Sequence, residues 1–228
     1  MTARWLALLA SATLLGADVP RAGCVAQHGR IFELLGVSGL FARGPQLGSA
    51  SAHGCSDRLA VFVDDSGLSV NGRRTGWSGP AVIGFGASEA IVAGESEMLR
   101  SDGVAWRPEP ARWRRPVAVT VTLSGEPAAI EQRGDQVWIA TPDGHELLGG
   151  KVSAAVLWPD KAAVLVREAG VVFRSPRGEE VHTGVKLSPE AGLAWISSNR
   201  VQMGDRCLER IGDGFRVWVL PAGQEDRQ

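Results

Sequence analysis

The sequence has no tyrosine, only three cysteines and no apolar run long enough to span a membrane. A transmembrane helix needs about 20 consecutive apolar residues, and the apolar run over residues 5–17 ends at Asp18, Pro20 and Arg21. The net charge of −1 provides no overall basic character for nucleic acid. The sequence therefore predicts neither a membrane span nor nucleic-acid binding.

The common catalytic and cofactor motifs are also missing. Residues 94–98 lack the final glycine of a nucleophile elbow, and residues 84–89 lack the third glycine of a dinucleotide-binding loop. Residues 64–67 have too few carboxylates for a calcium loop and fit a hairpin turn. The three cysteines and four histidines show no metal-binding spacing. We therefore expect no cofactor and no metal, and the sequence identifies no catalytic residue.

The N-terminus is typical of a cleavable export signal. Arg4 precedes an uncharged apolar run over residues 5–17, as in the charged and hydrophobic parts of a signal peptide. The small residues Gly16 and Ala17 fit a cleavage site after residue 17, with Ala22 and Gly23 as alternatives. The sequence thus predicts a signal peptide over 1–17 and a periplasmic or secreted mature protein.

An oxidising compartment favours a disulfide between two of the three cysteines, Cys24, Cys55 and Cys207. Cys24 with Cys55 is the local pairing, whereas a bond to Cys207 would link the two ends of the mature chain, and the sequence leaves both open. Ala22 to Cys24 also resembles the end of a lipidation motif. Arg21 stands where that motif has an apolar residue, so we do not expect a lipid anchor at Cys24.

Short apolar and β-branched runs alternate with turn residues along the mature chain, which indicates strands. Aligning the segments that begin at Arg58, Glu89, Ala128, Lys161 and Gly192 gives a repeat of about 33 residues. Each unit begins with a compact apolar strand, and a further strand precedes most units. Only residues 30–40 have a helical pattern, with a strand pair around Gly36 as the alternative.

This pattern resembles the β-propeller proteins, in which small antiparallel meanders surround a central channel. The resemblance is one of architecture and implies no specific family. It predicts an all-β, propeller-like array of about five meander units, with a β-sandwich or an irregular barrel as the alternative. We expect an N-terminal segment over 18–50 that is a candidate to complete the last unit, one repeat domain over 51–221, and a frayed tail over 222–228. Ring closure would pair residues 215–220 with the N-terminal region.

One local cluster stands out, because residues 106–116 combine two tryptophans, four arginines and three prolines. Prolines favour an extended connector, and arginine binds carboxylate or phosphate while stacking on indole. The alternative is a linker with solvated charges and tryptophans that cover the core. The candidate binding residues are Trp106, Arg107, Arg112, Trp113, Arg114 and Arg115.

Two functions remain from the sequence. The first is an exported, non-catalytic binding or scaffolding protein of the cell envelope that holds another envelope protein or an anionic glycan. The second is an exported hydrolase or lyase whose active site is assembled across repeats. An enzyme would gather two or more titratable residues in one pocket. The candidates are His28, His53, His145, His182, Asp64, Asp160 and Glu168.

Overall fold

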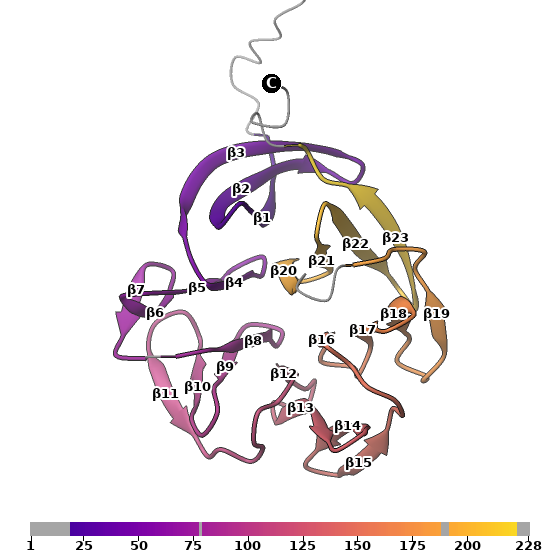
Figure 1. Cartoon of the computed structure of the whole chain (residues 1–228). Coiled ribbons are helices and arrows are strands. Elements are labelled where there is room, and N and C mark those ends of the chain that lie inside the picture. The colour runs from indigo at the N-terminus through magenta and orange to yellow at the C-terminus, as the bar shows by residue number, and fades with distance from the viewer. Residues whose placement is uncertain (1–18, 78, 188–191, 223–228) are drawn as a thin grey trace, which may run out of the picture.

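The computed structural model describes residues 19–77, 79–187 and 192–222. The regular secondary structure of these residues consists of β-strands. Figure 1 shows small sheets arranged around a common centre. The predicted all-β class and β-propeller architecture are therefore confirmed, in place of a sandwich or irregular barrel. The predicted signal peptide over 1–17 and residues 223–228 of the predicted tail lie outside the described residues.

The first sheet is a three-stranded meander of β1 (Arg21–Gln27), β2 (Arg30–Val37) and β3 (Leu40–Ser49). Residues 30–40 are thus a strand pair and not a helix, although the turn falls at Ser38 and Gly39. The pairing of β2 with β3 shifts register on both sides of Phe32, and the buried residues Ile31 and Leu34 are three apart. This bulge explains the helix-like spacing in the sequence.

Three further meanders form separate four-stranded antiparallel sheets in chain order. Their first two strands are buried along most of their length, which explains the compact apolar runs in the sequence. The first of these three sheets contains β8 (Val82–Phe85), β9 (Ala90–Ala93), β10 (Met98–Ser101) and β11 (Trp106–Glu109). The second contains β12 (Ala118–Val121), β13 (Pro127–Arg133), β14 (Gln136–Thr141) and β15 (Gly144–Leu147). The third contains β16 (Ala154–Leu157), β17 (Ala163–Arg167), β18 (Gly170–Arg174) and β19 (Glu180–His182).

The two remaining meanders share one eight-stranded sheet. One contains β4 (Ala52–Cys55), β5 (Ala60–Asp64), β6 (Gly67–Val70) and β7 (Arg73–Thr75). The other contains β20 (Leu193–Ser197), β21 (Arg200–Met203), β22 (Arg206–Ile211) and β23 (Gly214–Val219). They join where β20 pairs in parallel with β4 at Trp195 and Gly54. Counted as continuous sheets of at least four strands, the described residues therefore form four blades and not the five expected.

The ring closes through its innermost strands. Around the centre of Figure 1, β4 contacts β8, β8 contacts β12, β12 contacts β16, β16 contacts β20, and β20 returns to β4. The expectation that residues 215–220 close the ring is wrong, because β23 is the edge strand of the eight-stranded sheet. A parallel pair of buried inner strands achieves closure instead, and it removes two exposed strand edges at the centre.

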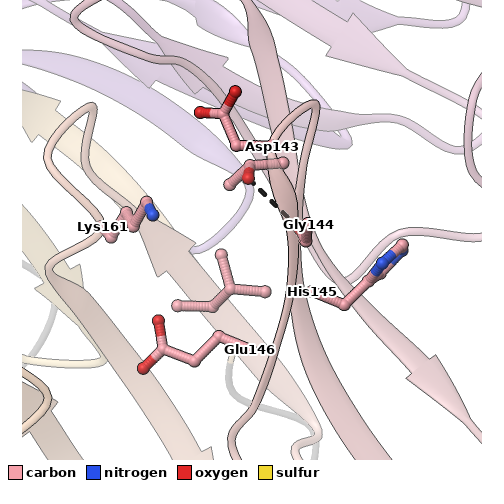
Figure 2. Close-up of a pocket in the computed structure, with 7 residues that line it drawn as sticks. Asp143, Gly144, His145, Glu146 and Lys161 are labelled. Atoms are coloured by element: carbon pink, nitrogen blue, oxygen red, sulfur yellow. Dashed lines mark hydrogen bonds between the residues drawn. The ribbon is translucent and has the colours of Figure 1, made fainter.

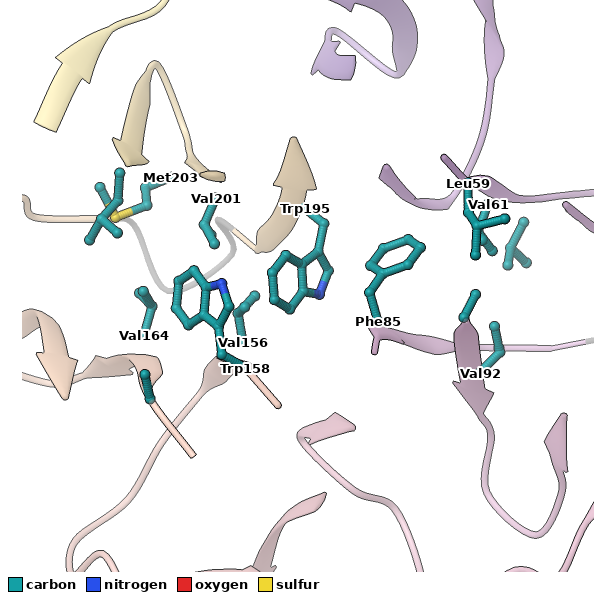
Figure 3. Packing of buried hydrophobic residues seen from close by; sticks show 14 of the residues in the cluster. Leu59, Val61, Phe85, Val92, Val156, Trp158, Val164, Trp195, Val201 and Met203 are labelled. Atoms are coloured by element: carbon teal, nitrogen blue, oxygen red, sulfur yellow. The ribbon is translucent and has the colours of Figure 1, made fainter. Parts of the chain in front are cut away.

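Aromatic side chains occupy the centre of the ring, as Figure 3 shows. The ring centroids of Trp158 and Trp195 are 5.2 Å apart, and those of Trp195 and Phe85 are 5.8 Å apart. Each indole also donates a hydrogen bond to a backbone carbonyl of another strand or turn, Trp195 to Ile83 at 3.2 Å and Trp158 to Ser198 at 3.0 Å. These contacts join different blades at the axis, so the centre is a packed core.

The N-terminal sheet spans the joint between the first and last meanders. On one side the disulfide Cys24–Cys55 links β1 to β4, and it is the local one of the two pairings that the sequence leaves open. On the other side the Gln202 amide exchanges two hydrogen bonds with the Ala26 backbone, at 2.8 and 2.7 Å. Cys207 is a free, buried thiol.

A buried ion pair reinforces this second side. The Glu209 carboxylate accepts hydrogen bonds from Arg200 at 2.7 Å, from Ser38 at 2.6 Å and from Trp218 at 2.8 Å. Burial would raise the pKa of Glu209, but these hydrogen bonds outweigh it and the net shift is downward. The β2–β3 turn is thereby fixed to the last meander.

Candidate binding surface

The arginine-rich connector, defined here as residues 106–116, includes β11 and the chain that leads to β12. Its three prolines cannot donate to a β-ladder. β11 is accordingly an outer strand, paired only with β10 within the described residues, and the following residues cross to the next sheet. The connector thus lies on the surface between two blades, as the sequence predicts.

The two tryptophans of the connector face the protein interior to different degrees. Trp113 is only 8% exposed and packs in a cluster with Ile91, Ala93 and Met98. Trp106 is half-buried against the central core, and its indole N–H is buried without a hydrogen-bond partner. Trp113 therefore anchors the connector and is not displayed to a partner, which agrees with the core-covering alternative for this residue.

The four arginines of the connector, in contrast, are exposed to solvent. Three of them form ion pairs with acidic residues of neighbouring turns. The pairs are Arg107 with Asp102 at 3.3 Å, Arg112 with Glu126 at 3.4 Å, and Arg115 Nε with Glu95 at 2.9 Å. Arg114 is exposed and forms no ion pair or side-chain hydrogen bond within the described part of the chain.

These ion pairs are weak because they are exposed to solvent. The side chains of Arg115 and Glu95 are 79% and 70% exposed, and an exposed ion pair contributes about 0–1 kcal/mol. An incoming carboxylate can replace Glu95 at little cost. Asp102 lies five residues before Arg107, whereas Glu95 and Glu126 come from turns that the fold brings beside the connector.

A groove of about 370 Å³ opens beside Arg115. Its lining is mostly apolar and comes from the residues before β8, the β8–β9 pair and the start of the next blade. Beneath it, Gly94 lies so close to Trp77 that an added Cβ would come within 2.7 Å of the indole. The lining residues besides Glu95 and Arg115 are Pro80, Ala81, Val82, Ala93, Gly94 and Pro116.

A second hollow, of about 300 Å³, lies along β10 and β11. Arg100 crosses it between the carboxylates of Glu89 and Glu109, and the hydrogen bond that Arg100 donates to Glu89 is the main cause of its raised pKa. Asp102 and Arg107 lie at the same hollow. Backbone hydrogen bonds from the following turn lower the pKa of Asp102, so that its charge offsets Arg107. Three carboxylates and two arginines line this hollow, so it has no excess of arginine.

The residues proposed for an enzyme do not converge in the cavities near them. A cavity of about 210 Å³ at β14–β15 contains one of them, His145, and the cavity between the N-terminal sheet and the last meander contains another, His28. In Figure 2, His145 points to the opposite side of β15 from Glu146, as consecutive strand residues do. Asp160 and Asp64 are paired with Arg210 and Arg74.

The described residues contain no cluster of three or more histidine, cysteine or acidic side chains arranged to hold a metal. They also contain no helix of the length and apolar character needed to cross a bilayer. His53, on β4, is the histidine with a strong shift, since burial lowers its pKa to about 4.

The ring of small antiparallel meanders, closed by its inner strands, places the protein in the β-propeller class. No family model matches the sequence, and no curated protein matches it. Solved structures with a similar fold include PorZ, a surface component of the type-IX secretion system of Porphyromonas gingivalis (11% identity, TM-score 0.47). Others are virginiamycin B lyase from Staphylococcus aureus (10%, 0.40) and YCF48 bound to D1 peptide (13%, 0.39).

These similarities concern the fold alone. The matches cover 91%, 91% and 89% of this chain, in the same order, and 86% of the lyase and 84% of YCF48. The chain spans only 39% of PorZ.

Proposed function

We propose that this protein is an exported, non-catalytic binding or scaffolding module of the cell envelope, periplasmic or secreted, which presents a rigid propeller surface to an anionic partner. The observation that carries the proposal is the arginine-rich connector. Trp113 fixes it to the core while its four arginines remain in solvent. Guanidinium groups held on a firm backbone are suited to bind carboxylate, sulfate or phosphate.

Two features support the exported location. The Cys24–Cys55 disulfide is of the kind that persists in oxidising compartments, and residues 1–17 have the composition of a signal peptide. Expression of the full chain in a bacterial host, followed by fractionation and N-terminal sequencing, tests this part. We expect a periplasmic or secreted product that begins at Asp18. A cytoplasmic product that retains Met1 would contradict export.

The binding role is tested with a triple variant, Arg112→Ala, Arg114→Ala and Arg115→Ala. Its control carries Arg30→Ala, Arg58→Ala and Arg216→Ala, which remove the same charge from exposed arginines outside the connector. We expect wild type and control to bind immobilised polyglutamate or polygalacturonate at low salt, and the connector variant to lose binding with a nearly unchanged melting temperature. Equal binding by all three proteins would refute the connector as the binding surface.

A further inference from the structure

The groove beside Arg115 specifies the chemistry of the partner more closely than the arginines do. Its lining of proline, alanine and valine side chains offers neither exposed indole faces nor an array of hydrogen-bonding groups. Carbohydrates bind through such groups, whereas an apolar wall suits an apolar side chain. A volume of about 370 Å³ lies at the lower end of small-ligand sites, which corresponds to one or two side chains.

The rim of the groove carries an ion pair between Arg115 and Glu95, and Arg115 is the cation among the lining residues. The pair between Arg115 and Glu95 is highly exposed and can exchange. An acidic group near the groove would therefore gain a guanidinium partner.

The groove is also rigid, which reduces the entropic cost of binding. Val82 and Ala93 lie opposite each other at the end of the antiparallel β8–β9 pairing. Ala93 packs with the buried Trp113 in one cluster, and Gly94 lies against Trp77. Two indoles therefore support the floor, and neither is free to move away without disturbing the core.

We infer that the groove binds an extended acidic segment of a partner protein, with an apolar side chain in the groove and a neighbouring carboxylate on Arg115. This inference rests on the proposed binding function and deepens it, because it selects a protein over a glycan.

Two single variants test the inference, Arg115→Glu and Arg58→Glu. They make the same change of charge at exposed positions, but Arg115 lines the groove and Arg58 lies outside both the groove and the connector. The probes are an array of fluorescent octapeptides, each with a central Leu, Ile, Val or Phe and two Asp residues, measured by anisotropy alongside polygalacturonate. Matched peptides replace the apolar residue with Ser or both Asp residues with Asn.

We expect Arg115→Glu to weaken peptide binding about tenfold or more, and Arg58→Glu less than about twofold. Replacing the apolar peptide residue with Ser is expected to cost about tenfold. Circular dichroism melting of both variants establishes that they are folded. Equal losses from the two variants, or no loss from the Ser peptide, would overturn the groove assignment.

The two proposals fail in different ways. Binding of polygalacturonate without binding of any peptide would overturn the inference and leave the proposed function standing. If neither the peptides nor polygalacturonate bound wild-type protein, both would be overturned.

Discussion

His53 is the residue whose ionisation should matter most for stability in acid. Its imidazole Nε2 is buried without a hydrogen-bond partner, and burial lowers its pKa from 6.5 to about 4. Between these values the unfolded chain binds a proton that the folded chain excludes. The unfolding free energy is therefore not reduced by this group above pH 6.5, and it declines as the pH falls toward 4.

We therefore predict that His53→Leu removes part of the acid sensitivity. Wild type should lose about 2–3 kcal/mol more unfolding free energy than the variant between pH 7 and pH 4.5, from the size of the pKa shift. Urea unfolding at the two pH values measures this difference. His182→Leu, at an exposed position, serves as control and should follow wild type. Parallel losses in wild type and His53→Leu would contradict the burial of His53.

Cys207 offers a second test at the scale of one side chain. Burial raises the pKa of its thiol to about 12, and the thiolate is the reactive form. We predict that the native protein does not react with iodoacetamide at pH 8, and that it gains one adduct in concentrated urea without reductant. Mass spectrometry counts the adducts. Rapid labelling of the native protein, or three adducts in urea, would show that the thiols are arranged differently.

The tryptophans show how far single residues could be interpreted from the sequence. Trp195 lies in a strand pattern, and its burial follows from that position. Trp113 lies among prolines and arginines, where the sequence favours core covering but leaves ligand contact as the alternative. What decides between them is the cluster of Ile91, Ala93 and Met98 from a neighbouring sheet, and that proximity arises only in the fold.

The inner strands of the ring pack very close to one another. Gly84 on β8 lies so near β12 that an added Cβ would come within 1.7 Å of the Val119 carbonyl oxygen. Gly48 on β3 has open space at the same position, and neither glycine has a positive φ. Substitution of Gly48 can therefore serve as the control for substitution of Gly84.

We predict that Gly84→Ala lowers the free energy of unfolding by about 2 kcal/mol or more, because two inner strands must separate. Gly48→Ala should change it by less than about 0.5 kcal/mol. Chemical unfolding followed by tryptophan fluorescence gives both values. A small effect of both substitutions would mean that β8 and β12 are farther apart than described.

The strands and turns were predictable because local chemistry determines them, whereas their place in the repeat was only partly so. Four of the predicted unit starts align with the second strands of meanders, β5, β9, β13 and β17, but the start at Gly192 leads into β20, a first strand. Both strands are buried and apolar, so one sequence cannot distinguish their phase. The pairing of β4 with β20 was likewise not foreseen, because no local signal marks a parallel partner.

At the scale of the whole molecule, the N-terminal sheet joins the two ends of the ring. Removing the disulfide with Cys24→Ser and Cys55→Ser should lower the unfolding free energy by about 3 kcal/mol, because the unfolded chain regains the freedom of a 31-residue loop. Urea unfolding with and without reductant measures the same loss in wild type. The double variant should be insensitive to reductant. An unchanged midpoint for wild type under reduction would contradict a stabilising role for the bond.

The parallel pairing of β4 with β20 has a consequence for the order of events during biosynthesis. β4 is synthesised early, whereas its partner β20 follows only after three complete four-stranded sheets. Closure is therefore a late, long-range step, of the kind that folds slowly and exposes strand edges. Cys24 and Cys55 are both available from the start, so the bond can form first and tether the N-terminal sheet beside the unpaired edge of β4. The sheet would then cover this edge and hinder self-association until β20 pairs with β4.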